Sequence, residues 1–530
     1  MTANYDYIVV GAGPAGLQLG YYLQKMGCSY IILEKDDKAG AFFERYPRHR
    51  RLISINKIYT GYDDKSINLR WDWNSLLCDH DGLLFKNYSK DYLPNADVLV
   101  DYLNDFANYY KLHISFNTEV ASIVKKEGVF VVKDKEGNGY CGKRLVVATG
   151  TFKPYIPDIE GAELVEDNYT NVSADPMDFC GQRVLILGKG NSAFELADTL
   201  IPTTALIHLA SPEPVKMAWK THHVGHLRAI NNNFLETYLL KGQNALINGH
   251  ITKIEKVEDV YRVTIAYNLA NDEVEQIDYD RIIFTTGFQF DDSIFDESCK
   301  PELAIKGRFP KQTSEWESTN VKDMYFAGIL MHMRDFKKKQ SGFIHGFRYN
   351  IAALCKMFGR KYHQQPLPFE RLPLTAKAIT DKIIERVNRS SSLWQQTGFL
   401  GDYFALDHEN GEVRYYEGLP VDYMKDSELG EASNWYAVTL EFGQEIIDRS
   451  PDVFAVERIH KDDHPNAKES TGIHPIIRGY EEGEQRSEHH LIEDFTSEWK
   501  REVHTKPLEI FFRQEIEQAQ TAEKLNFARS

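Results

Sequence analysis

One pattern of apolar and polar positions occurs twice in the 530-residue chain. Each copy starts with a short apolar run, passes through a glycine-rich turn and a helical pattern to a second apolar run, and closes much later on a third. The first copy starts at residues 7–10 and closes at 145–148, and the second starts at 184–187 and closes at 282–284. This order predicts an α/β fold with two doubly wound units of the Rossmann type.

Alternating apolar and polar residues at 113–132 and 250–267 predict a small antiparallel meander before each closing strand. After Gly287 a charged, loop-like stretch leads to a strand at 324–327 and a helix at 341–358, which we expect to return to the first unit. One unit is therefore expected to be inserted in the other.

The expected boundaries follow from this insertion. The first unit should comprise residues 1–172 and 288–365, and the second residues 173–287. Residues 366–530 show no motif, and we expect them to pack on the first unit as a mostly helical extension.

The first glycine turn directly follows a predicted strand and has the spacing of a dinucleotide-binding motif. Gly11 allows the tight turn, Gly13 lets the backbone approach a pyrophosphate, and Gly16 lets the helix pack closely on the strand. The helix opens at Pro14 and Ala15, with its N-terminus towards the phosphates.

A carboxylate stands where the ribose of such a nucleotide is expected. The second strand ends at Glu34 and Lys35, and a carboxylate there can bind both ribose hydroxyls of an adenosine. Other residues expected at the nucleotide are those of the closing turn and of the returning strand: Ala148, Thr149, Gly150 and Gly328.

The second glycine turn has the same spacing. Gly188 and Gly190 are followed by Asn191, Ser192 and an alanine in place of the third glycine. We expect Asn191 and Ser192 to cap the helix and to bond the phosphate or amide of a nicotinamide nucleotide.

The coenzyme preference is predicted from the end of the second strand in this unit. Ser211 stands there instead of a carboxylate, and Lys216 and Lys220 follow, so a 2′-phosphate would meet hydroxyl and ammonium groups. This favours NADPH over NADH, although the two lysines also fit a solvated surface. Two dinucleotide units in one chain indicate a flavoprotein in which hydride passes from NADPH to FAD.

Composition narrows the function further. With 62 Lys and Arg against 78 Asp and Glu, the net charge of −16 disfavours nucleic acid as a partner. No apolar stretch approaches the roughly 20 residues of a membrane span. The six cysteines form no CxxC pair, so neither a metal site nor a disulfide framework is expected, and we expect a cytoplasmic protein. The oligomeric state stays open.

The glycine motifs and closing turns resemble those of the flavin-containing monooxygenases. Longer stretches, at 44–61, 71–74, 227–232 and 341–349, are similar to the endoplasmic-reticulum flavoproteins associated with degradation. Two departures matter. Tyr169 and Ser173 stand where the monooxygenase fingerprint has histidine and tyrosine, which argues against the usual oxygenation of sulfur and amines, and the dithiol of disulfide reductases is missing.

The overall plan is also similar to that of bacterial single-component flavin-dependent brominases of phenolic acids. This resemblance implies that NADPH reduces FAD, that oxygen adds to give a flavin hydroperoxide, and that bromide or an electron-rich ring is oxidised, for example 4-hydroxybenzoate with decarboxylation. A flavin-dependent hydroxylase of an aromatic or amine, and a reductase that serves a protein partner, remain as alternatives.

Four residues are candidates for the chemistry. Asn56 could offer an amide to the flavin hydroperoxide, and Lys57 an ammonium to the substrate or to the oxidised halogen. His345 and Arg348 lie one helical step apart on the returning helix, so a substrate carboxylate could meet both. A surface turn for the first pair, and core or capping roles for the second, are the alternatives.

Overall fold

The computed structural model describes residues 3–241, 244–271, 273–427, 434–449, 452 and 455–527. The first unit is built on a seven-stranded sheet. Its strand order is β3 (Ile114–Ser115), β2 (Tyr30–Leu33), β1 (Ala3–Val10), β6 (Gly139–Val147), β5 (Val129–Asp134) and β4 (Val120–Lys126), and β17 (Met324–Phe326) pairs with β6. β1 runs parallel to β2 and β6, whereas β4 and β5 form the predicted antiparallel meander.

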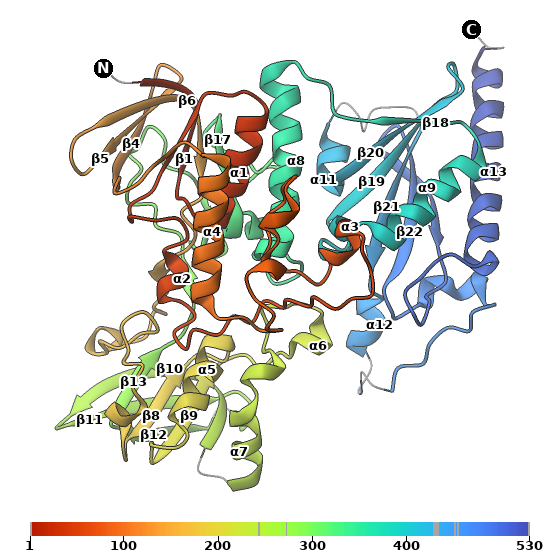
Figure 1. The fold of residues 1–530 in the computed structure, drawn as a ribbon. Coiled ribbons are helices and arrows are strands. Elements are labelled where there is room, and N and C mark those ends of the chain that lie inside the picture. The colour runs from red at the N-terminus through yellow and green to blue at the C-terminus, as the bar shows by residue number, and fades with distance from the viewer. Residues whose placement is uncertain are drawn as a thin grey trace.

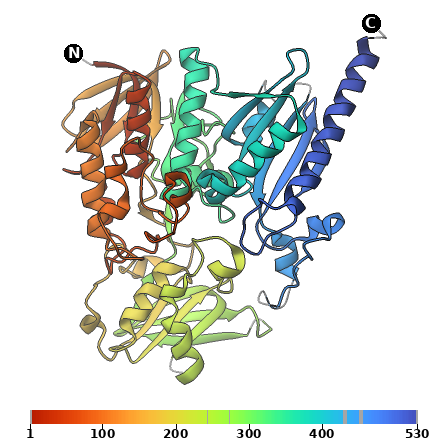
Figure 2. The same cartoon turned by 45° about the vertical axis from the view of Figure 1, so that its right-hand side comes forward.

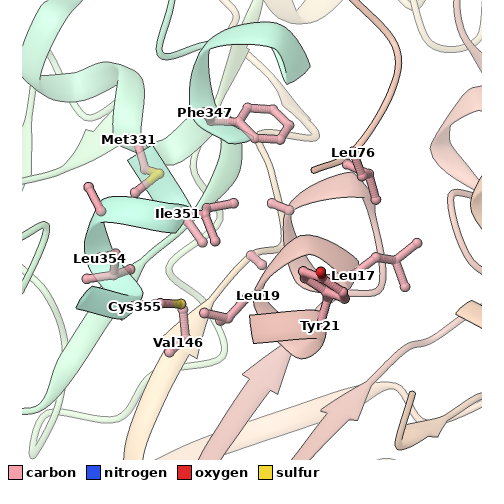
Figure 3. Packing of buried hydrophobic residues seen from close by; sticks show 14 of the residues in the cluster. Leu17, Leu19, Tyr21, Leu76, Val146, Met331, Phe347, Ile351, Leu354 and Cys355 are labelled. Carbon is pink, nitrogen blue, oxygen red and sulfur yellow. The ribbon is translucent and has the colours of Figure 1, made fainter. Parts of the chain in front are cut away.

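Helices α1 (Pro14–Lys25), α4 (Ala96–Tyr110) and α8 (Ile344–His363) pack with this sheet (Figure 1). Figure 3 shows the apolar core between them, where Ile351 and Cys355 of α8 lie close to Leu19 of α1 and Val146 of β6. Because α8 comes back from beyond the second unit, it confirms the predicted insertion.

The second unit has a six-stranded sheet. Its order is β12 (Val274–Tyr279), β11 (Val260–Tyr267), β10 (Asn244–Val257), β9 (Leu206–Ser211), β8 (Arg183–Leu187) and β13 (Arg281–Phe284). β8, β9, β10 and β13 pair in parallel, and α5 (Asn191–Leu200) and α7 (Asn233–Lys241) accompany them. The doubly wound α/β prediction is therefore confirmed for both units.

Two linkers join these units, and they pair with each other as β7 (Lys153–Pro154) and β14 (Phe288–Gln289). Ala162 and Ile159 pack in the core of the second sheet, and Glu160 forms a bridge to Lys253 of β10. The second unit therefore begins near β7, ahead of the residue 173 that the sequence suggested.

The C-terminal region forms a third sheet, so the expectation of a mostly helical extension is wrong. Its order is β18 (Glu370–Pro373), β20 (Glu412–Pro420), β19 (Leu400–Asp407), β21 (Trp435–Glu441), β22 (His474–Glu481) and β23 (Glu484–His490), all antiparallel. One face packs on α8 and the other on α9 (Ala376–Arg389) and α13 (Glu502–Phe527) (Figure 1). Strands buried on both faces lack the alternation by which a strand is usually recognised.

Shorter elements complete the fold: α2 (Phe42–Arg45), α3 (Lys65–Asn68), α6 (Ala218–Thr221), β15 (Leu303–Ala304), β16 (Phe309–Pro310), α10 (Ser391–Gln395), α11 (Val421–Asp426) and α12 (Gln444–Arg449). The second unit lies below the other two, and its α6 lies beside α12 of the C-terminal region (Figures 1 and 2). Among the described residues, no helix combines the length and apolar character needed to traverse a bilayer.

Candidate functional site

The first glycine turn leaves open space where the motif predicts a phosphate. Gly11 has a left-handed φ of +106°, and a Cβ on it would lie 2.7 Å from the carbonyl oxygen of Ala148. A Cβ on Gly16 would lie 2.0 Å from the carbonyl oxygen of Gly11, whereas a Cβ on Gly13 would meet no atom within 4 Å. Packing of the protein therefore requires Gly11 and Gly16, and Gly13 keeps space free at the start of α1.

A fixed carboxylate lies beside that space. Glu34 is only 8% exposed, and its Oε2 accepts a hydrogen bond from the amide of Ala12 at 2.6 Å while Oε1 accepts one from the amide of Asp36 at 3.0 Å. Burial raises the pKa of Glu34. No side chain caps the N-terminus of α1. The free amides and the carboxylate fit the pyrophosphate and the ribose of FAD.

The closing turn packs against the glycine turn as expected. The amide of Ala148 donates to the carbonyl of Val10 at 2.9 Å, and Thr149 and Gly150 follow, with Gly150 at a left-handed φ of +74°. Gly328 also lies here, because a Cβ on it would lie 2.7 Å from Cβ of Ala15. Lys35 is exposed, with its Nζ 5.2 Å from the ring centre of Phe152.

The second glycine turn repeats this geometry. A Cβ on Gly188 would lie 2.7 Å from the carbonyl oxygen of Thr285, and a Cβ on Gly190 would meet no atom within 4 Å. α5 begins after Gly190 without a side-chain cap, and Ser192 lines a small pocket together with Tyr169 and Thr286. A second nucleotide fits at the start of α5.

Asn191 does not cap the helix as predicted. Its amide Nδ2 donates to the carbonyls of Gly225 and His226 at 3.2 and 2.8 Å, and its Oδ1 accepts from the amide of Arg228 at 2.9 Å. All its bonds go to the loop at 225–231, because Asn191 is the first residue of the helix and Gly190 is the cap. Asn191 therefore fixes this loop to the start of α5.

The polar groups at the end of β9 include one residue that the sequence analysis missed. Nζ of Lys189 donates to the carbonyls of Ser211 and Glu213 at 3.1 and 3.2 Å and also bonds Oδ1 of Asn248. Burial lowers the pKa of Lys189 to about 8. Its position between the two motif glycines was the available signal. An ammonium thus stands beside Ser211.

Lys216 is exposed. Burial is the main cause that lowers the pKa of His226 and of Lys337, and the charge of Lys216 contributes to both shifts. Within the described part of the chain, no hydrogen bond joins the side chain of Lys216 to that of Ser211. Lys216 is thus tied electrostatically to the loop beyond β9 rather than to the strand end.

Asn56 and Lys57 occupy different environments. Nδ2 of the buried Asn56 donates to the carbonyls of Ser89 and Asp91 at 2.8 and 3.2 Å, and only its Oδ1 is left without a partner. Both amide donors are used, so the predicted donation to a flavin hydroperoxide is not available. Lys57 is exposed, with Nζ 5.8 Å from the ring centre of Trp71.

His345 lies in the first turn of α8 and is 2% exposed. Its ring stacks on Trp73 at 4.3 Å and 24° and on Phe343 at 5.7 Å and 14°. Neither ring nitrogen has a hydrogen-bond partner. Burial, together with the charges of Arg348 and Arg228, holds the pKa of His345 well below its usual value. This environment disfavours the charged form of His345.

Arg348 does not share a substrate with His345 in this arrangement. It is fully buried, and its two terminal nitrogens donate to the carbonyls of Ser75 and Leu69, both at 2.7 Å. The guanidinium fastens α8 to the loop at 69–75. The expected role in carboxylate binding is replaced by a structural one.

One set of contacts joins the first unit to α5. Tyr46 stacks on Tyr169 at 5.8 Å and 21°, and the hydroxyl of Tyr169 donates to Oε2 of Glu195 at 2.9 Å. The amide of His49 donates to the other oxygen of Glu195 at 3.2 Å. Tyr169 is thus an interface residue, whereas the hydroxyl of Ser173 donates to Oδ2 of Asp178 at 2.5 Å and accepts from the amide of Asp175 at 3.1 Å.

A second set of contacts holds the opposite side of the same unit. His222, which follows α6, stacks on Phe442 of the C-terminal region at 4.0 Å and 11°, and its Nδ1 lies 2.8 Å from Oε1 of Gln444. Nε2 of Gln340 donates to the carbonyl of His222 at 3.0 Å. The second unit is therefore held on two sides.

A third set of contacts, which we call the Trp73 stack, is formed by Arg228, Trp73, His345 and Phe343. The guanidinium of Arg228 lies 5.3 Å from the ring centre of Trp73, and its Nη1 donates to the carbonyl of Ile53 at 2.9 Å. Three of the four sequence stretches that carry the longer resemblance contribute residues to the stack, and the fourth contributes the carbonyl of Ile53 that Arg228 bonds. The first and second units therefore meet at this stack.

Comparisons with known proteins agree with this site. The sequence profile described as pyridine nucleotide-disulphide oxidoreductase matches residues 8–328, more than half of the chain. The mouse (Mus musculus) protein named FAD-dependent oxidoreductase domain-containing protein 2 is 36% identical over 96% of this chain and 83% of its own. The chain belongs to the pyridine nucleotide-disulphide oxidoreductase family. It is a FAD-dependent oxidoreductase, and a pyridine nucleotide is the typical second cofactor of this class.

Solved structures show the same fold at low identity. Bacillithiol disulfide reductase from Staphylococcus aureus is 19% identical with a TM-score of 0.50, over 68% of this chain and 100% of its own. A mutant flavin monooxygenase from Stenotrophomonas maltophilia is 18% identical with a TM-score of 0.50, over 68% of this chain and 99% of its own. These matches establish the fold.

Proposed function

We propose that the chain is a monooxygenase-type enzyme that binds FAD, consumes NADPH and oxygen, and oxidises a small aromatic substrate. The observation that carries the proposal is the fixed apposition of the two nucleotide units at the Trp73 stack. Glu195 is held from one side and His222 from the other. A fixed arrangement suits direct hydride transfer between the cofactors in a site that excludes water. Bound FAD would supply the activation of oxygen.

The cysteines support this choice over a thiol-dependent reductase. The sequence contains no CxxC pair, and among its six cysteines, all free, Cys299 and Cys355 are buried. A disulfide relay requires two sulfur atoms within bonding reach of each other. The chain's own polar groups around the Trp73 stack are instead a histidine and an arginine.

The test is NADPH oxidation by the FAD-loaded enzyme with a panel of phenols and phenolic acids, combined with mass spectrometry of the products. We expect at least one aromatic to accelerate NADPH oxidation about tenfold and to gain one oxygen atom. Bromide is added in a parallel set, because bromination of a phenolic acid is the narrower hypothesis, although the names of the relatives give it no support. Oxidation that ignores every aromatic but reduces an added ferredoxin would instead establish a reductase for a protein partner.

A further inference from the structure

Arg228 is a half-buried cation without a counter-ion. Among the described residues, its guanidinium makes one hydrogen bond, from Nη1 to the carbonyl of Ile53, and it lies against the face of Trp73. No carboxylate of the described residues pairs with it, and burial lowers the pKa of Arg228. A guanidinium carries five N–H donors in a planar fork. Most of this fork is therefore available to an anion.

The same stack holds a buried group without partners. His345 stacks on the ring of Trp73, against which Arg228 also lies, and neither of its buried nitrogens has a hydrogen-bond partner. Buried polar groups are nearly always satisfied in folded proteins, so each exception requires an explanation. A buried histidine without partners and a guanidinium without a counter-ion, both against one indole ring, indicate that a ligand with polar groups completes this site.

The backbone of Arg228 links the Trp73 stack to the second nucleotide site. Its amide donates to Oδ1 of Asn191, the first residue of α5, at 2.9 Å, while its side chain reaches Ile53 of the first unit. An anion bound by the guanidinium would therefore lie between the second glycine turn and the first unit. In the proposed function, the substrate would lie in this region, between the two nucleotide sites.

We propose that Arg228 binds the carboxylate of an aromatic acid, which is the substrate class of this enzyme. This inference rests on the proposed function. A carboxylate accepts two parallel hydrogen bonds from a guanidinium fork, and charge assistance makes such bonds strong. Arg348 cannot take this role, because its terminal nitrogens are bonded to backbone carbonyls. A phosphate of NADPH is the other anion that the fork would attract, and the experiment separates the two.

The experiment uses the FAD-loaded full-length enzyme and pairs of probes that differ only in charge: 4-hydroxybenzoate with 4-hydroxybenzamide, and 4-hydroxyphenylacetate with its amide. Binding is measured by calorimetry and by the change in flavin absorbance. We expect the wild-type enzyme to bind each acid about 10- to 100-fold more tightly than its amide. In Arg228→Gln this preference should fall below about twofold, while the KM for NADPH changes less than threefold.

Arg70→Gln is the matched control. Arg70 also lies over a tryptophan, 4.3 Å from the ring centre of Trp394, and also donates to a backbone carbonyl, that of Asn388. Its variant should keep the acid preference. FAD content and Tm establish that both variants fold, and Arg228→Lys, which keeps the charge, should retain part of the preference.

Each other outcome overturns the inference in a distinct way. Equal binding of acid and amide by the wild-type enzyme, together with aromatic-dependent NADPH oxidation, rejects Arg228 but keeps the proposed function. A rise in the KM for NADPH with an unchanged acid preference assigns the guanidinium to the coenzyme. No binding of any phenol, with no stimulation of NADPH oxidation, rejects both.

Discussion

At the level of single residues, the nucleotide sites depend on polar groups that still have free hydrogen-bond donors or acceptors after all their bonds to the protein are formed. Glu34 accepts one amide hydrogen bond at each carboxylate oxygen, so lone pairs remain for two ribose hydroxyls. In contrast, the side-chain amide of Asn191 makes all its hydrogen bonds to the loop at 225–231. The same position in a motif can therefore serve either a ligand or the protein itself.

Replacing Glu34 should weaken FAD binding. In Glu34→Ala the ribose loses charge-assisted hydrogen bonds worth about 1.5–3 kcal/mol, so affinity should fall roughly 10- to 100-fold. Glu34→Gln, the matched control, keeps one acceptor and should lose less. FAD affinity of wild type should also decline on acidification, because burial raises the pKa of Glu34 and protonation removes an acceptor. Equilibrium dialysis of apoprotein with FAD measures both effects, and an unchanged affinity in Glu34→Ala would contradict the assignment.

Unlike Glu34 and Asn191, His345 makes no side-chain hydrogen bond, because its two ring nitrogens are buried without partners. Replacing it with phenylalanine keeps a ring between Trp73 and Phe343 and removes the unsatisfied groups. We expect His345→Phe to raise the free energy of unfolding of the apoprotein by about 1 kcal/mol while lowering substrate-dependent NADPH oxidation. Urea unfolding and the oxidation assay measure the two. A destabilised variant would show that the enlarged ring does not fit.

At the level of elements, the two glycine turns separate packing from ligand space. Gly188 must be glycine because of the carbonyl of Thr285, whereas Gly190 faces open space. The sequence spacing could predict both turns because they impose backbone conformations that few other residues adopt. The motif also assigns the first glycine to the turn and the second to the approach of the ligand, and the space beside each glycine fits this division.

Paired alanine variants test this separation. Gly190→Ala should fold with normal FAD content and Tm but raise the KM for NADPH about tenfold, because the new methyl group fills the space beside the start of α5. Gly188→Ala should lower Tm or fail to fold, since its Cβ would lie 2.5 Å from Oγ1 of Thr285 and φ is +131°. Equal destabilisation by both changes would contradict a nucleotide at this turn.

The C-terminal sheet shows where pattern reading fails. Tyr403 faces α8 while its neighbour Phe404 faces α9 and α13, and Trp435 and Tyr436 divide in the same way. β19 and β21 are therefore apolar on both faces and have no period of two. The choice of Arg348 as a carboxylate ligand failed for a related reason. Helical spacing places a side chain on a face, but the loop at 69–75 that consumes its donors is distant in sequence.

At the level of the whole molecule, histidines at the contact between units predict a response to acid. His223 is 3% exposed, its Nδ1 bonds the carbonyl of Lys339 at 3.1 Å, and burial with the charges of His332 and His226 lowers its pKa to about 4. Between pH 6.5 and 4 the unfolded state binds more protons than the folded state, so stability falls as pH falls.

The contribution of His223 is measurable as a slope. Over that interval each such histidine changes the free energy of unfolding by at most about 1.4 kcal/mol per pH unit. His223→Gln, which cannot be protonated, should therefore show a shallower loss of stability on acidification than wild type. Urea unfolding at several pH values gives the slopes, and identical slopes would show that His223 does not contribute to the loss of stability in acid.

We expect the C-terminal region to restrain the movement of the second unit. Phe442 stacks on His222, and Gln444 bonds the same histidine, so the segment that carries Arg228 is fastened to a sheet that shares its core with α8. Phe442→Ala should therefore increase amide hydrogen exchange at 216–228, where the amide of Leu227 donates to the carbonyl of Lys216, while exchange in β1 and α1 and the FAD content stay unchanged. Phe369→Ala is the control, because Phe369 packs on Tyr416 within the C-terminal region and is 37% exposed.

If the contact between Phe442 and His222 holds the two units at the Trp73 stack, NADPH oxidation in Phe442→Ala should also become less dependent on an aromatic substrate. Exchange at 216–228 that matches wild type would show that the contacts of Asn191 and Gln340 hold the segment without help from the C-terminal region.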